Sequence, residues 1–528
     1  MHSIDTAALS AKPATRGKLS LHPLFRDFGL TAFTELGVLV SGLAIVSLMG
    51  RLLGVAALGE YLLLRRVLAW LQPAVQLGMG NALPRYVAYD ADGPPGQLRR
   101  YLAVSVILSG GLAALLAFIL YFGRGTFARW LFGSVHLQSL ILPLGLLILG
   151  LTIHGSAYGY FRGRLALIQA NALQICNLVF LPVIVVIGLA KTQSVALIVG
   201  ATGLATLFFS TTACTFLLRR SAAGPLGMRG TASKLLRYGV PRVPGDFALG
   251  GLLALGPLVA MHFVPISSVT CLLLGISILS AVNASSTPVG TLMLSKVSMM
   301  LSQERHSEVR VHLRHLLAAT IDVSVFVTIQ LIVFADVMLR LWVGPRFDGR
   351  AGVARIILLA VPFFLIYGCL RSSVDAASIT AYNTSNIFIS CMLFIVLLGG
   401  VVVLVPRGLA VDGVAVSLVT AFVMLAWLTV RTTRKLFGLG VPWRECTSGL
   451  LIGFILTGAT FAARLMAGNG ALALPLITSL AFVTYLLILK MIGTQWLSFF
   501  LDVALQRARS LSVVGCQFHD GALPEVEC

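Results

Sequence analysis

The sequence predicts an all-α polytopic membrane protein with about 14 transmembrane helices, arranged as two pseudo-symmetric six-helix lobes plus two C-terminal helices. Composition is the first observation: of 528 residues, 58% are hydrophobic and 11% are charged, whereas a soluble chain carries about 25% charged residues. The mean hydropathy of +0.94 is the second. The third is that long apolar runs recur along the chain, some of them as copies at a constant offset.

The apolar runs are long enough to cross a bilayer, because a spanning helix needs roughly 20 apolar residues. The predicted spans are 31–50, 61–85, 101–122, 137–158, 166–188, 194–218, 245–265, 270–298, 315–337, 353–381, 384–405, 411–431, 446–466 and 471–492. The connections between them are short, so no soluble catalytic domain has room to fold.

The formal net charge is +20. In a membrane protein, Lys and Arg gather in cytoplasmic loops and fix the orientation of the chain. In these loops they also contact anionic lipid headgroups. An even number of spans with both termini cytoplasmic places most of the basic residues on the cytoplasmic side. The sequence therefore predicts membrane lipids, and no nucleic acid, as partners.

The sequence lacks the motifs of several kinds of site and enzyme. Most of the eight cysteines fall in apolar segments and none forms a CxxC or Cys/His cluster, so no disulfide framework and no metal site are expected. No GxxxxGK[ST] loop is present, which argues against ATP hydrolysis. The segment "HPLFRD" (22–27) has the His-x4-Asp spacing of some acyltransferases, but nothing else supports that activity. We therefore expect that the chain is not an enzyme and needs no cofactor. The first 30 residues are polar and lack the apolar core of a signal peptide.

Internal repeats organise the chain. The segment "LFRDFGLTAFTE" (24–35) aligns without a gap on "LLRYGVPRVPGD" (235–246), which places Glu35 opposite Asp246. "LRRYLA" (98–103) resembles "LRHLLA" (313–318), and "ARWLFG" (128–133) resembles "LRLWVG" (339–344), with the offset staying at 211–215 residues. Six spans separate the copies, so both have one orientation, as in two parallel lobes related by an axis along the membrane normal.

These features predict the domain organisation. The expected parts are a cytoplasmic N-terminal tail (1–30), a first lobe (31–218), a basic cytoplasmic linker (219–242), a second lobe (243–436), two further helices (443–493) and a cytoplasmic tail (494–528).

One region resembles a known family. "GRLLGVAALGEYLLLRRVLAWLQPAVQLGMGNALPRY" (50–86) is similar to the first two helices of polysaccharide transporters, the Wzx-like flippases of the multidrug/oligosaccharidyl-lipid/polysaccharide (MOP) exporter superfamily. The pattern stands here as Arg51, Leu53, Gly54, Gly59, Tyr61, Leu77, Gly78 and Ala82. "LLRYGVPRVPGD", "LRLWVG" and "AVDGVAVSLVTAFVMLAWLTVRTTRKLFG" resemble later segments of the family in the same order, so the resemblance covers roughly residues 20–440.

The resemblance implies a flippase in a bacterial inner membrane that translocates an undecaprenyl-pyrophosphate-linked oligosaccharide by alternating access, for surface polysaccharide. Its partners would be the lipid-linked oligosaccharide, membrane lipids, and a polysaccharide polymerase and chain-length regulator. Two alternatives share the architecture: a small-molecule or multidrug exporter, and a lipid II flippase. An exporter of organic cations would favour an acidic cavity, whereas this chain places arginines within its spans.

Arg65 and Arg66 are adjacent within a predicted span. A charge in hydrocarbon costs at least about 2.5–3.5 kcal/mol, so such residues normally face the bundle interior or a cavity. Adjacent helical residues point about 100° apart and cannot share one face. Either at least one arginine lines a cavity and binds the diphosphate, for which the planar guanidinium fork is suited, or both extend to the headgroups.

Arg371 and Asp375 are four residues apart in another predicted span, so they can pair on one helix face. Either the pair keeps the segment neutral, or it acts as a gate that opens when substrate phosphate competes for Arg371.

Glu35 and Asp246 occupy matched positions in the two repeats. Buried carboxylates can exchange a proton near physiological pH, which would suit ion coupling. Alternatively, each acid lies near a helix N-terminus and complements the dipole. Asp322 is a third acid within a span, and no role is assigned to it.

Overall fold

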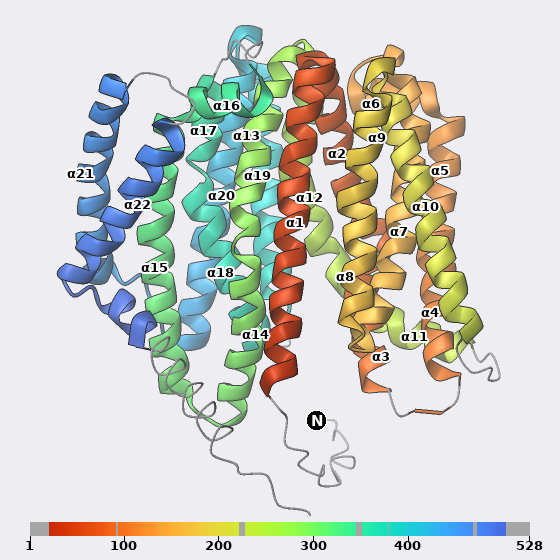
Figure 1. Ribbon diagram of the computed structural model, residues 1–528, viewed down its shortest axis with the longest axis horizontal. Helices are drawn as coiled ribbons and strands as arrows, with labels where there is room; N and C mark the ends of the chain where they lie inside the picture. Colours follow the sequence, from red (N-terminus) through yellow and green to blue (C-terminus); the bar gives the residue numbers. More distant parts are fainter. Residues whose placement is uncertain are drawn as a thin grey trace, which may run out of the picture.

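The computed structural model describes residues 21–90, 93–94, 96–220, 228–344, 351–378, 380–467 and 473–502. Every regular element in these ranges is a helix, which confirms the predicted all-α class (Figure 1). Within the described ranges, 12 helices are long and apolar enough to cross a membrane, and the bent pair Leu476–Met491 and Gln495–Asp502 raises the number to 13. Large apolar side chains such as Phe208 and Val403 point outward, as lipid contact requires. The chain is a multi-pass membrane protein.

The remaining predicted span corresponds to α2 (Val55–Gln76) and α3 (Met79–Tyr89). α2 has 22 residues, which at 1.5 Å per residue gives about 33 Å, enough to span the hydrocarbon core. Its three charged residues, Glu60, Arg65 and Arg66, reduce its apolar character. The helix stops at Leu77 and Gly78, both of which have positive φ angles. We therefore count α2 as a further spanning helix.

The first lobe is built from α1 to α10. Besides α2 and α3, its helices are α1 (Leu21–Leu53), α4 (Gln97–Ser105), α5 (Gly111–Phe122), α6 (Arg124–Phe132), α7 (Ile141–Gly163), α8 (Leu167–Ile175), α9 (Leu181–Leu189) and α10 (Val195–Arg220). The π-helical turns η1 (Val106–Gly110) and η3 (Cys176–Phe180) connect α4 to α5 and α8 to α9, so each pair forms one span. The short 3-10 helices η2 (Val135–Leu140) and η4 (Ala190–Thr192) extend the start of α7 and the end of α9.

The second lobe begins after α11 (Met228–Gly239) and η5 (Val240–Arg242). Its helices are α12 (Val243–Ala260), α13 (Ile266–Ala284), α14 (Thr287–Ser302), α15 (His306–Val333), α16 (Ala335–Val343), α17 (Ala351–Leu358), α18 (Val361–Ala377), α19 (Tyr382–Leu404), η6 (Arg407–Leu409) and α20 (Ala410–Phe437). The C-terminal pair, α21 (Trp443–Ala467) and α22 (Ala473–Met491), packs against α15, where the rings of Phe326 and Tyr485 stack at 4.4 Å.

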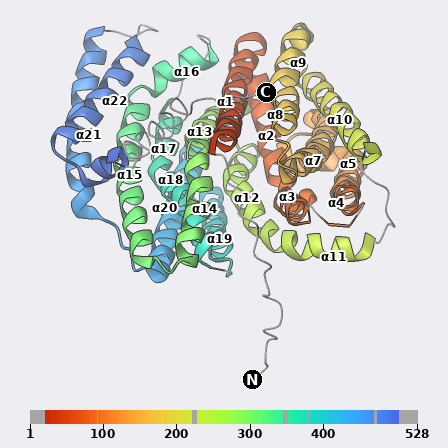
Figure 2. The same ribbon diagram turned by 60° about the horizontal axis from the view of Figure 1, so that its bottom comes forward.

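The sequence repeats correspond to matching elements. α6 and α16 each have nine residues, and they lie at the same end of the molecule (Figure 1). We call this end the α16 side. The opposite end carries α11, which lies flat across the end of the first lobe (Figure 2), and we call it the α11 side.

The first repeat differs between its two copies. α1 runs without interruption through residues 24–35, whereas the second copy divides into α11, η5 and α12. Pro241 and Pro244 lie at this division. Proline lacks the backbone N–H that a continuing helix would use, and it tolerates only the first turn of a new helix. The prolines therefore explain why α11 turns away from the direction of α12.

The two lobes meet along α2, which packs against α12 and α13 of the second lobe. Gly250 permits this approach, because a Cβ there would lie 3.0 Å from the Cα atom of Trp70. On the α16 side, α1 also contacts α16, where Trp342 Nε1 donates a hydrogen bond of 2.8 Å to the carbonyl of Leu43. One hydrophobic core therefore continues from the first lobe into the second.

Candidate functional site

Arg65 faces a cavity inside the first lobe. The cavity has a volume of about 120 Å³ and is lined from α1, α2, α7, η3, α9 and α10, with Tyr61, Asn177, Thr202 and Thr206 supplying polar groups. Arg65 Nη1 lies 3.4 Å from the hydroxyl of Tyr61, one helical turn earlier. Among the described residues that line the cavity, none is acidic. The guanidinium therefore brings a positive charge to a polar cavity without a carboxylate to neutralise it.

Arg66 points in a different direction, toward the second lobe. Its Nη2 donates to Ser277 Oγ at 3.0 Å and its Nη1 donates to Ser280 Oγ at 3.2 Å, both on α13. The angle of about 100° between adjacent helical residues produces this divergence. Arg66 is therefore a bridge between the lobes, while Arg65 remains available to the cavity.

The depth of Arg65 along its helix differs from the depth that the predicted span implied. The span expected at 61–85 would place Arg65 about one turn from the membrane surface. α2 instead begins at Val55, so Arg65 lies ten residues into the helix, about 15 Å along its axis. Arg65 therefore lies near the middle of this 22-residue helix.

Arg371 lies in a polar cluster that connects α12, α18 and α19. Its Nη2 is 3.2 Å from Asp246 Oδ1 on α12, and its Nε is 4.0 Å from Asp375 Oδ2 on its own helix. Asn383 Nδ2 donates to Asp375 Oδ1 at 2.7 Å and to the carbonyl of Arg371 at 2.8 Å. The predicted pair at i and i+4 is therefore present, but Asp246 is the nearer partner of Arg371.

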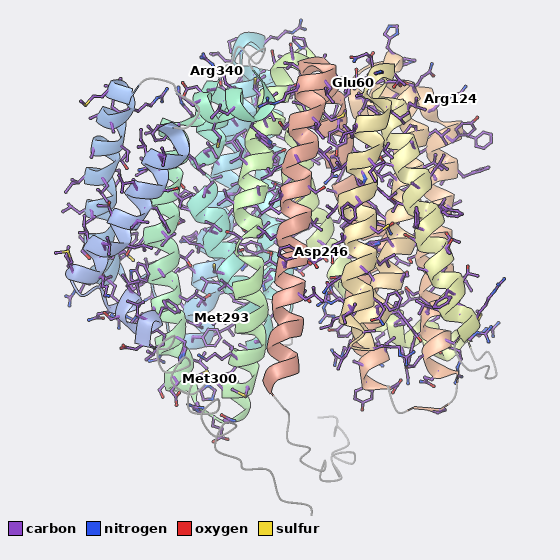
Figure 3. The ribbon with its side chains drawn as sticks, viewed as in Figure 1. Glu60, Arg124, Asp246, Met293, Met300 and Arg340 are labelled. Carbon is purple, nitrogen blue, oxygen red and sulfur yellow. The ribbon has the colours of Figure 1, made fainter. Side chains whose placement is uncertain are left out.

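The two matched acids have different surroundings. Asp246 lies in the first turn of α12, as the dipole interpretation requires, and Figure 3 places it near the centre of the molecule. Glu35 is 14 residues into α1, which begins at Leu21, whereas the dipole acts only within the first turn. Its Oε1 instead accepts a hydrogen bond of 3.2 Å from Gln174 Nε2 on α8.

The site residues that we predicted thus fall into separate groups. Arg371, Asp246 and Asp375 come together, while Arg65, Arg66 and Glu35 each have their own surroundings among the described residues. Asp322 belongs to none of them: its Oδ2 accepts a hydrogen bond of 2.8 Å from Trp496 Nε1 beside the C-terminal helices.

Sequence reasoning missed three contributors, namely Asn383, Ser277 and Ser280. The two serines are spaced i and i+3 within α13, which places them on one face. That spacing was a usable signal. Asn383 gave no such signal, because its role depends on the approach of α19 to α18.

Comparisons with known proteins give a clear answer only for the fold. No protein-family model matches the chain, and no curated protein matches its sequence. The lipid II flippase MurJ in an inward closed conformation superposes with a TM-score of 0.69 at 14% identity, covering 89% of this chain and 99% of MurJ. The chain has the fold of the MOP-superfamily transporters.

Two MATE transporters extend the comparison. An inward-facing MATE-family transporter of the MOP superfamily gives a TM-score of 0.57 at 14% identity, covering 82% of this chain and 95% of that one. A eukaryotic MATE transporter gives 0.54 at 12% identity, covering 81% and 100%. The expected MOP fold is confirmed, whereas membership of the Wzx-like group within it rests on the sequence motifs and stays a prediction.

Proposed function

We propose that the chain is a flippase of a bacterial inner membrane that translocates an undecaprenyl-pyrophosphate-linked oligosaccharide for surface polysaccharide synthesis. The observation that carries the proposal is Arg65, a guanidinium near the middle of α2 that opens onto a polar cavity with no acidic residue in its described lining. An unpaired cation within a spanning helix is costly. A diphosphate would neutralise it during transport, because guanidinium binds phosphate oxygens bidentately.

The cavity of about 120 Å³ is too small for an oligosaccharide. We therefore expect only the diphosphate to engage Arg65, while the sugars occupy space between the lobes and the prenyl tail stays in lipid. Rocking of one lobe against the other would expose the substrate alternately to the two sides. Under this proposal the α11 side, with its basic α11, faces the cytoplasm. A polysaccharide polymerase and a chain-length regulator then act on the translocated oligosaccharide.

The polar clusters give the proposal two subsidiary roles. Arg371 would act as a gate if substrate phosphate competes with Asp246 and Asp375 for its guanidinium. Glu35 is the better candidate for ion coupling, because Asp246 and Asp375 already share Arg371.

A lipid II flippase is the second candidate, and the resemblance in fold to MurJ over 89% of this chain favours it. It needs the same cationic contact with diphosphate, so Arg65 does not discriminate. A multidrug exporter is less well supported, because organic cations would be repelled by Arg65.

The experiment that tests the proposal is deletion of the gene, followed by complementation with wild type, Arg65→Ala or Arg65→Lys. Surface polysaccharide and membrane-bound lipid-linked oligosaccharide are measured together. We expect wild type to restore export, Arg65→Ala to leave the lipid intermediate accumulated at least tenfold, and Arg65→Lys to restore export in part. Unchanged polysaccharide after deletion, with no second flippase present, would remove the proposal. Rescue of a strain depleted of its lipid II flippase would favour the second candidate.

A further inference from the structure

Two arginines on the α11 side share one aromatic ring. The Cζ atom of Arg85, on α3, is 4.4 Å from the ring centroid of Tyr238, and the Cζ atom of Arg242, on η5, is 3.9 Å from the same centroid. The two guanidinium carbons are therefore no more than about 8.3 Å apart. Both side chains are exposed, so their charges are available to a ligand.

Neither arginine has an acidic partner within hydrogen-bonding or ion-pairing distance in the part of the chain that the structure describes. Arg242 Nη1 donates to the carbonyl of Tyr238 at 2.7 Å, which holds the side chain in place and leaves most of its N–H groups free. The nearby Asp90 is engaged by Gln97 and Tyr101. The two positive charges thus repel each other. Asp375 attracts Arg242 from beyond ion-pairing distance, and neither arginine forms an ion pair with the residues that the structure describes.

The ring between them is rigidly supported. Tyr86 packs edge-on against Tyr238 at 6.1 Å and stacks on the buried Tyr101 at 5.9 Å. Next to these three rings, the backbones of Gly78 and Gly239 approach so closely that a Cβ on Gly78 would lie 2.3 Å from the carbonyl oxygen of Gly239. Such support fixes the ring on which both guanidiniums rest, which reduces the entropy lost on binding.

We propose that Arg85 and Arg242 form an anion site that holds the phosphate or diphosphate group of a lipid on the α11 side. Two guanidinium forks within about 8.3 Å of each other can each bind oxygens of one diphosphate. η5 leads directly into α12, whose first turn carries Asp246, so the site adjoins the start of the second lobe (Figure 2). This inference deepens the proposed function, because it rests on that function for the kind of lipid and places the first contact outside the cavity of Arg65.

The same chemistry has two sources, a lipid headgroup and a free diphosphate. The test uses the full-length protein in phosphatidylcholine nanodiscs, titrated by calorimetry with inorganic pyrophosphate and, separately, with farnesyl diphosphate as a short prenyl diphosphate. The variants are Arg85→Ala/Arg242→Ala, the fork-removing Arg85→Lys/Arg242→Lys, and Tyr238→Phe, which retains the ring. Arg229→Ala is the matched control, because Arg229 is an exposed arginine of α11 that has no such ring contact with the residues that the structure describes.

We expect farnesyl diphosphate to bind wild type, and the double alanine variant to weaken this binding at least tenfold. The double lysine variant should lie between them, and Tyr238→Phe and Arg229→Ala should stay within twofold of wild type. Pyrophosphate binding that is equally tight and equally dependent on both arginines supports the anion site but assigns it to a soluble diphosphate. Unchanged binding in the double alanine variant, or an equal loss in Arg229→Ala, overturns the site.

The outcome is separable from that of the proposed function. If binding depends on the arginine pair but the chain does not restore surface polysaccharide, the anion site stands and the polysaccharide assignment fails. If the chain restores polysaccharide while the double alanine variant binds both ligands normally, only the anion site fails. Circular dichroism and size-exclusion profiles check each variant for a folding defect. If the double alanine variant does not fold, the double lysine variant tests the site, because it removes the guanidinium forks and keeps the positive charges.

Discussion

Arg371 illustrates how a single charged residue can be accommodated within a membrane span. The guanidinium and its two carboxylates are only partly exposed, with side-chain accessibilities of 39% for Arg371, 32% for Asp246 and 47% for Asp375. Each ion therefore depends on its partner more than a surface ion would. The shorter distance to Asp246 makes the contact between α18 and α12 the stronger half of the cluster.

The first residue-scale prediction is that Arg371 couples to Asp246 more strongly than to Asp375. Double-mutant cycles with Arg371→Gln, Asp246→Asn and Asp375→Asn should give about 1–2 kcal/mol for the first pair, between surface and buried values, and less for the second. Equilibrium unfolding in mixed detergent–SDS micelles measures the coupling. The exposed pair Arg305 and Glu308 is the control, with an expected coupling smaller than that of Arg371 and Asp246. A larger coupling to Asp375 would contradict the geometry.

The sequence identified the charged residues of the candidate site but not the residues that they contact. The divergence of Arg65 and Arg66 follows from helical geometry alone, so it could be predicted. That Arg66 meets serines of α13, and that Arg371 meets Asp246, depends on which helices touch. The i, i+4 spacing identified Asp375 because local spacing is visible in a sequence, whereas Asp246 lies 125 residues away.

At the scale of elements, the contact between α2 and α12 joins the lobes through small residues. Lipid-embedded helices gain little from the hydrophobic effect against each other, so close backbone approach at glycine is a main source of their association. Gly250 provides that approach, because its missing side chain leaves room for the backbone of Ala69 and Trp70.

The element-scale prediction is that Gly250→Ala separates α2 from α12. The added Cβ would lie 3.0 Å from Trp70 Cα and 3.1 Å from the carbonyl oxygen of Ala69, and these backbone atoms cannot move aside cheaply. We expect a loss of about 1–3 kcal/mol, as for other overpacked sites. Thermal unfolding in detergent measures it. Gly37→Ala is the control, since nothing lies within 4 Å of its added Cβ, and a helical alanine should be neutral or slightly stabilising.

The positions of the helices were largely predictable, and their interruptions were not. Apolar length located the spans because the bilayer imposes it. The end of α2 at Leu77 and Gly78, the flat course of α11 and the π-helical turns depend on local backbone geometry and on neighbouring helices. The prolines at 241 and 244 were visible in the sequence, and the predicted span at 245–265 begins just after them. The course of α11 depends on its contacts with α3 and α4.

At the scale of the whole molecule, the lobes are closed against each other on the α16 side. Trp342 donates to the carbonyl of Leu43, Arg51 donates to the carbonyl of Leu341, and Gly50 lies against Val343. All of these contacts join α1 of the first lobe to α16 of the second. Alternating access requires such contacts to separate in one half of the cycle.

The whole-molecule prediction is that a covalent bond across this contact stops transport. A Cβ on Gly50 would lie 2.6 Å from Val343 Cγ1, so cysteines at the two positions are within reach of a disulfide, whose Cβ atoms are about 3.5–4.5 Å apart. In a background lacking the eight native cysteines, Gly50→Cys/Val343→Cys should lose export on oxidation and regain it with a reductant. The control pair Ala117→Cys/Gly145→Cys joins α5 to α7 within the first lobe and should leave export unchanged. Full export by the oxidised, cross-linked α1–α16 variant would mean that the α16 side need not open, and rocking of the two lobes could not then be the transport step.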